Sequence, residues 1–157
     1  MTVHLRDYPE ARLAAQPIGY WADATARLVL ARIRGELAEE RLTQPQWWCL
    51  NHIAGAPGGW QRAALADKLR PYTVGIVPAV DFDLVLDDLL DRGRLTEDAN
   101  GLTLTEAGEA GRQRAHHRLA AAHEQIHDGI TPAEWAAALN VLRRMVANLG
   151  GYADLPS

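Results

Sequence analysis

One pattern in the sequence could hold a catalytic metal. His123-Glu124-Gln125-Ile126-His127 matches H-E-x-x-H, in which two histidines on one helix face bind zinc and the glutamate acts as general base. His116 would share this face, so a structural zinc or nickel site is the milder alternative. A third catalytic ligand has no familiar place, and a short chain has little room for a hydrolase cleft. We therefore expect solvated histidines, no metal, no cofactor and no enzyme.

A second group of reactive side chains is acidic. We expect a helix from about Ala79 to Arg92, and at 100° per residue its apolar side chains share one arc: Phe82, Val85, Leu86, Leu89 and Leu90. The opposite arc carries five carboxylates: Asp81, Asp83, Asp87, Asp88 and Asp91. No Lys or Arg stands between Arg70 and Arg92, although cations on a protein surface normally neutralise DNA phosphates. The exposed face of this helix is therefore unusual for a DNA reader.

The stretch from Leu89 to Gly111 links the acidic helix to the histidine-containing helix and must position both. Gly93 stands where a helix C-cap favours positive φ. Short strand signals follow at 94–96 and 102–104, with Asn100-Gly101 predicted as the turn, and Thr105 is expected to cap the next helix. Helix, strand, turn, strand and helix in this order predict the wing of a winged helix-turn-helix.

Helical periodicity accounts for most of the remaining chain. A long helix is expected over 18–40 and a short one over 61–69. Thr43 and Thr131 each begin a capping box with Pro in the first turn, so helices are expected after both. One more long helix should run from Thr105 to about Asp128. The last helix carries a row of apolar side chains suited to packing on another helix: Trp135, Leu139, Leu142, Val146 and Leu149.

The phrases "L.DRG.L … L.LTEAG" and "LTQPQWWCLNHI" closely resemble the MarR (multiple-antibiotic-resistance regulator) family. The resemblance implies a mostly α, homodimeric winged helix-turn-helix protein that regulates transcription. Residues 43–108 would form the winged-helix lobe of a single domain, and residues 1–42 and 109–157 the dimerisation helices. The residues expected to contact DNA are Arg62, Lys68, Arg70, Tyr72, Thr73, Arg92 and Arg94.

Two segments depart from the family pattern. Residues 70–78 contain two prolines around a β-prone run, which predicts an enlarged loop where family members have a brief turn. The predicted wing tip, residues 97–101, lacks the usual Arg. Two hypotheses therefore stay open. Either the lobe still contacts duplex DNA, or it is a degenerate MarR-like dimer that acts through ligand or protein binding.

The same resemblance gives the aromatic residues a possible role, because small aromatic or lipophilic effectors bind near the dimerisation helices in this family. Trp21, Trp47, Trp48 and His52 could line such a pocket, or they could simply plug the junction of two lobes. Cys49 could sense oxidants, but no cation or second cysteine lies nearby in sequence, so a buried inert thiol is expected.

Composition sets the outer bounds. The chain has 157 residues, 48% of them hydrophobic, and a net charge of −4, which suits one globular domain. No apolar run is long enough to span a membrane, no signal-peptide core follows the N-terminus, and the single cysteine excludes an internal disulfide. We expect a cytoplasmic protein.

Overall fold

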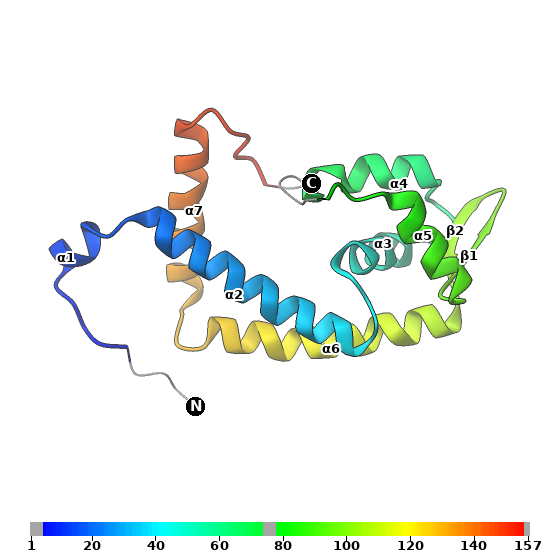
Figure 1. Ribbon diagram of the computed structural model, residues 1–157, viewed down its shortest axis with the longest axis horizontal. Coiled ribbons are helices and arrows are strands. Elements are labelled where there is room, and N and C mark those ends of the chain that lie inside the picture. Colours follow the sequence, from blue (N-terminus) through cyan, green and yellow to red (C-terminus); the bar gives the residue numbers. More distant parts are fainter. Residues whose placement is uncertain (1–4, 74–77, 156–157) are drawn as a thin grey trace. The chain divides into compact units, whose positions relative to one another are not determined.

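The computed structural model describes residues 5–73 and 78–155 (Figure 1). The elements follow in the order α1 (Glu10–Ala14), α2 (Ile18–Glu39), α3 (Gln44–Gly55), α4 (Arg62–Leu69), η1 (Arg70–Thr73), α5 (Phe82–Asp91), β1 (Leu95–Asp98), β2 (Gly101–Leu104), α6 (Glu106–His127) and α7 (Pro132–Asn148). The chain divides into two compact units, residues 17–122 and residues 1–16 with 123–157. The predicted mostly α fold with a two-stranded wing is confirmed.

The core of the larger unit forms around α3, which contacts α2, α4, α5 and β2. Thr43 caps α3 through the predicted capping box, in which the Thr43 hydroxyl and the Gln46 side chain each bond to the other residue's backbone N–H. Leu50 and Ile53 of α3 are fully buried, as are Leu65 of α4 and Leu86 of α5. This packing holds the helix-turn-helix and the wing on one scaffold.

Helix α5 begins later than the sequence predicts. The Asp81 carboxylate accepts hydrogen bonds from the backbone N–H groups of Asp83 and Leu84, so Asp81 is the N-cap and Ala79 lies outside the helix. The predicted arcs are confirmed: the apolar arc packs on the core and the aspartates of the other arc are exposed. Of the predicted loop, 70–73 instead forms the 3₁₀ turn η1, and 74–77 lie outside the described residues.

The wing is an antiparallel hairpin in which Leu95 pairs with Leu104 and Asp98 with Gly101. The predicted turn was one residue out of place, since Ala99 and Asn100 form it. Asp98 sets this register because its carboxylate accepts hydrogen bonds from the N–H groups of Asn100 and Gly101. Thr105 caps α6 as predicted, accepting from the Gly108 N–H.

The smaller unit contains α1 and α7. Thr131 caps α7 through the second predicted capping box. The predicted apolar row on α7 is largely exposed: Leu139, Leu142, Val146 and Leu149 have exposed fractions between 38% and 87%. Within the described residues, none of the helices has the length and apolar character needed to cross a membrane.

Candidate functional site

Arg62, at the start of α4, joins three elements of the winged-helix lobe. Its Nε and Nη2 donate to the Glu97 carboxylate on β1 at 2.9–3.0 Å, and its Nη1 donates to Asp87 on α5 at 2.8 Å. Asp83 lies 3.7 Å from the same Nη1. The hydrogen bonds that Arg62 donates to Glu97, and then the one to Asp87, raise the pKa of Arg62 further above its usual range. The guanidinium that could meet a DNA phosphate is thus already held by carboxylates.

Other predicted DNA contacts are also engaged within the protein. Arg70 pairs with Asp67 at 2.6 Å, and Arg92 pairs with Asp88 at 2.9 Å. Asp88 in addition accepts a hydrogen bond of 2.6 Å from Gln46 of α3, which fixes the end of α5 against the core. In each of these pairs a carboxylate occupies one guanidinium nitrogen and offsets the positive charge that a phosphate would meet.

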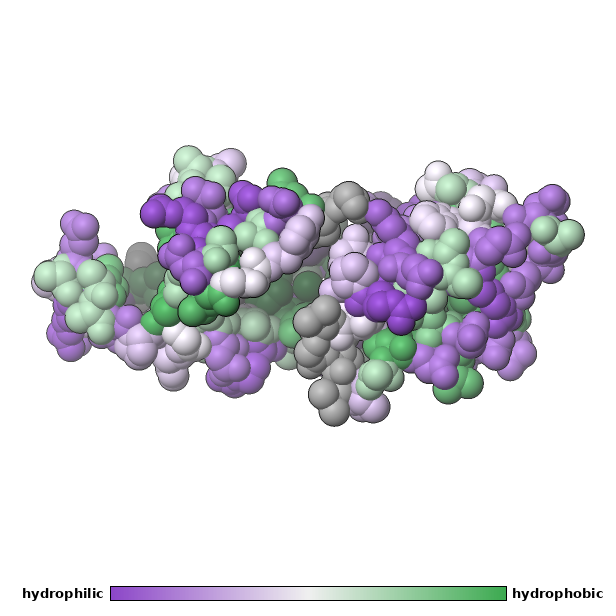
Figure 2. Space-filling view, turned by 90° about the horizontal axis from the view of Figure 1, so that it is seen from above, coloured by the Kyte–Doolittle hydropathy of each residue, from purple (hydrophilic) through white to green (hydrophobic). Residues whose placement is uncertain are grey.

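The face around these pairs is acidic. Asp83 and Asp87 keep side-chain exposures of 76% and 53% despite contact with Arg62, and Leu84 is exposed among the aspartates. An open groove of about 580 Å³ lies between α4 and the start of α5, bordered by Arg62, Ala63, Ala66, Arg70, Ala79, Val80, Asp81, Phe82 and Asp83. Figure 2 shows hydrophilic residues prevailing at the wing end of the face it draws.

Tyr72 belongs to an aromatic cluster rather than to an open loop. Its ring centroid lies 5.7 Å from that of Trp48 and 6.2 Å from that of His52. Trp60, which the sequence reasoning did not select, lies 6.1 Å from His52 and donates its Nε1–H to the His52 carbonyl. Trp60 also forms an antiparallel β-bridge with Leu102 of the wing, which local sequence does not indicate. Thr73 donates its hydroxyl hydrogen to the Arg70 carbonyl.

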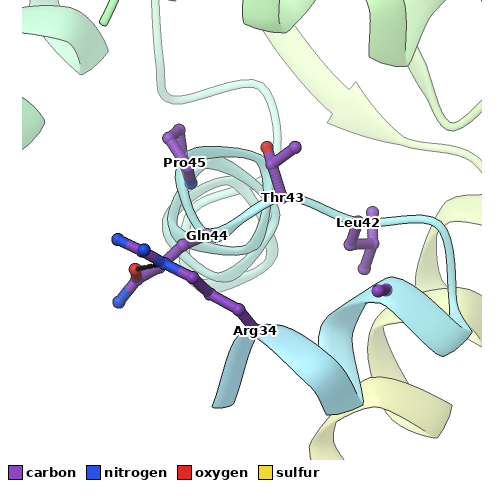
Figure 3. Close-up of a pocket in the computed structure, with 6 residues that line it drawn as sticks. Arg34, Leu42, Thr43, Gln44 and Pro45 are labelled. Atoms are coloured by element: carbon purple, nitrogen blue, oxygen red, sulfur yellow. Dashed lines mark hydrogen bonds between the residues drawn. The ribbon is translucent and has the colours of Figure 1, made fainter. Parts of the chain in front are cut away.

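The predicted effector residues lie in three different surroundings. Trp48 and His52 share the aromatic cluster, Trp47 is half-buried against the core, and Trp21 is exposed with an edge contact to Tyr20. A separate groove of about 390 Å³ instead lies between α2 and α3 (Figure 3). It is lined by Arg34, Ala38, Leu42, Thr43, Gln44 and Pro45. Arg34 Nε donates a long hydrogen bond of 3.4 Å to the Gln44 side chain.

The residues suited to metal or thiol chemistry are placed as follows. No group of three His, Cys, Asp or Glu side chains within residues 5–73 and 78–155 could hold a metal ion. His127 stacks on Trp135, with ring centroids 3.9 Å apart. Cys49 is fully buried, and this burial raises its pKa to about 12, so the thiol stays protonated.

Of the comparisons with known proteins, only the one with solved structures finds similar chains, and it agrees with the winged-helix fold. No protein-family model and no curated protein matches the sequence. Among solved structures, the chain is similar to the MarR family protein Rv2887 of Mycobacterium tuberculosis in complex with DNA, with 25% identity, a TM-score of 0.60, and coverage of 87% of this chain and 99% of that one.

Two further similar structures support the same fold. The transcriptional repressor CouR is 23% identical, with a TM-score of 0.65 and coverage of 83% of this chain and 93% of that one. The reduced form of MarR from E. coli is 20% identical, with a TM-score of 0.60 and coverage of 83% and 94%. Rv2887 is a MarR family protein and CouR a transcriptional repressor, and the chain is a winged helix protein with the fold of the MarR family.

Proposed function

We propose that this protein is a homodimeric transcriptional regulator that binds duplex DNA weakly until its own carboxylates release the cations of the lobe. The observation that supports this most is the likeness to Rv2887, which was solved with DNA, over nearly the whole length of that chain. The exposed apolar row on α7 supports a dimer, because isolated helices do not normally leave such a row in water.

The proposed duplex contacts are the residues that the sequence pointed to around α4, η1 and the end of α5, without the half-buried Arg94: Arg62, Lys68, Arg70, Tyr72, Thr73 and Arg92. Arg62 is the central one, because it joins α4 to both α5 and the wing. DNA phosphates would compete with Asp87 and Glu97 for the same guanidinium. We therefore expect a Kd of about 10⁻⁶ M or weaker at physiological salt, close to non-specific binding.

We propose a small aromatic carboxylate as the effector. Rv2887 has been solved with salicylic acid and with p-aminosalicylic acid, and CouR with p-coumaroyl-CoA. The groove between α2 and α3 supplies apolar walls from Ala38, Leu42 and Pro45, with the Arg34 guanidinium at its edge. An aromatic ring would lie on the apolar wall, and its carboxylate would pair with Arg34.

A second candidate function is a MarR-like dimer that does not read duplex DNA and instead binds a ligand or a basic protein. The aspartates of α5 and its N-cap favour it, because they leave the exposed face of this helix acidic, and entry into a DNA groove would strip water from their carboxylates. Fluorescence anisotropy with genomic-fragment pools of duplex DNA separates the two functions. Enrichment of one sequence, bound at least about a hundredfold more tightly than random duplex, supports the regulator. Equal, micromolar binding of all fragments supports the second candidate.

A further inference from the structure

A group of arginines gathers at the base of the wing, apart from the surface of α4. Arg94 directly precedes β1, Arg92 follows α5, Arg41 follows α2, and Arg114 belongs to α6. Arg92, Arg114 and Arg41 all lie close enough to Arg94 to act on it electrostatically. The four arginines thus come from three segments of the chain, because Arg92 and Arg94 share the link between α5 and β1.

Arg94 is held firmly in this region. Its backbone N–H donates to the Leu89 carbonyl at 2.8 Å, and its own carbonyl accepts from the Thr105 N–H at 3.1 Å. Arg94 Nη1 occupies the place that a Cβ on Gly111 of α6 would take, and Arg114 Nη2 lies 3.6 Å from that same place. The absence of a side chain at Gly111 therefore allows two guanidinium groups to converge over the helix.

The acids nearby do not match these cations. Buried Glu40 accepts from Arg114 at 2.8 Å and from Arg118 at 3.4 Å. Within the described ranges, the Arg94 side chain donates one weak hydrogen bond, of 3.5 Å to the Ala107 carbonyl, and the Arg41 side chain makes no ion pair or hydrogen bond. Burial, then the charges of Arg92 and Arg114, lower the pKa of Arg94. Holding like charges together in a partly dry place costs free energy that an anion would offset.

We propose that Arg94, Arg114 and Arg41 form a binding site for the phosphoryl group of a small molecule. Guanidinium groups bind phosphate oxygens through paired, charge-assisted hydrogen bonds, and several of them can share one phosphate. Arg94 is half-buried against α6 instead of standing at the wing tip. A compact phosphoryl group reaches such a place more readily than the backbone of a duplex does.

Calorimetric titration of the full chain with inorganic pyrophosphate at low ionic strength tests this site. We expect saturable binding of one pyrophosphate per chain. Arg94→Gln should weaken it at least tenfold, and Gly111→Ala should do the same, because the new methyl group displaces the Arg94 guanidinium while every charge is kept. Arg27→Gln is the matched control and should bind like the parent, since Arg27 pairs only with exposed Asp23 among the described residues.

If Arg94→Gln fails to fold, as judged by circular dichroism, Gly111→Ala and Arg41→Gln decide the question. Three results would overturn the proposal. One is the absence of saturable heat with the parent protein. The second is equal weakening by Arg27→Gln, which would mean a diffuse charge effect. The third is an unchanged affinity for pyrophosphate in Gly111→Ala, which would mean that the Arg94 guanidinium does not hold the anion.

Discussion

Arg62 and Glu97 lie 35 positions apart in sequence, yet their side chains form a bidentate ion pair with two N···O distances of 2.9 Å. Bidentate arginine–carboxylate geometry is the same that arginine uses toward phosphate. Because Asp87 binds the third guanidinium nitrogen, the carboxylates of the wing and of α5 compete with any nucleic acid for this one cation of α4. The winged-helix lobe therefore carries carboxylates that compete with DNA phosphates for Arg62.

The first prediction follows from this competition. Glu97→Gln should strengthen non-specific duplex binding several-fold, because it frees Arg62 to meet a phosphate. The dependence of log K on log salt should steepen by about one unit, the change expected for one added phosphate contact. Fluorescence anisotropy across a salt series measures both quantities.

Asp91→Asn provides the matched control, since it removes the same charge from the acidic face. Among the described residues, the Asp91 side chain makes no hydrogen bond or ion pair with Arg62 or with any other residue. The Asp91→Asn variant should raise the affinity for duplex DNA less than Glu97→Gln does, and it should leave the salt dependence unchanged. Equal effects of the two variants would mean that the total charge, and not the release of Arg62, limits DNA binding.

The second prediction contrasts two glycines of α6. A Cβ on Gly108 would collide with the backbone carbonyl of Arg94, which cannot move without shifting the wing. Gly108→Ala should therefore destabilise the fold by about 1–3 kcal/mol. At Gly111 the obstacle is the flexible end of the Arg94 side chain, and alanine gains up to about 1 kcal/mol in helix propensity. In urea denaturation, the free energy of unfolding of Gly111→Ala should equal or exceed that of the parent protein. If Gly111→Ala is instead less stable than Gly108→Ala, this account of the packing is wrong.

Local signals made much of the fold predictable. The two capping boxes, the positive φ of Gly93 and the arcs of α5 each depend on residues within one or two helical turns of each other. The misplaced start of α5 and the misplaced turn of the wing have the same cause. In each case an aspartate, Asp81 or Asp98, binds backbone N–H groups and fixes a boundary that apolar periodicity leaves free.

The site was less predictable, because its contacts join distant segments. The sequence pointed to Arg62 as a cation but gave no sign of its pairing with Glu97. It selected Trp48 and His52 together but missed Trp60, which joins them only after the chain has turned back onto β2. The groove beside Arg34 also went unseen, since its walls come from two helices whose relative placement no local pattern sets.

The third prediction concerns the effector groove. Salicylate should bind the parent protein, and Arg34→Gln should weaken that binding about tenfold, because the carboxylate loses its charged partner. Arg32→Gln, two residues earlier in α2, serves as the charge control, since Arg32 is not among the residues that line the groove. Isothermal titration calorimetry measures both, and unchanged affinity in Arg34→Gln would place the effector elsewhere.

The fourth prediction is a dependence on acid. Hydrogen bonds from Arg112 lower the pKa of Glu109 from 4.5 to about 2. A carboxyl with a lowered pKa contributes stability above pH 4.5, and that contribution is lost as the pH falls from 4.5 toward 2. The pair is partly exposed, so the gain is about 1 kcal/mol or less. Glu109→Gln should be less stable than the parent at pH 7, and the difference should vanish near pH 2 in urea titrations. Glu106→Gln, also in the first turn of α6, should show a smaller difference at pH 7.

The last prediction concerns assembly. Val146 lies in the apolar row of α7 and is 42% exposed in the single chain, as is much of the row around it. A second copy of the chain would remove this row from water, as two-fold dimers do with self-complementary surfaces. Val146→Asp would place a charge in that interface and should convert the protein to a monomer in multi-angle light scattering at micromolar concentration. Ala137→Asp carries the same new charge on the opposite side of α7, where the helical positions lie away from the row, and should remain dimeric. A parent protein that elutes as a stable monomer, or a dimer that both variants leave intact, would show that this row is not the interface.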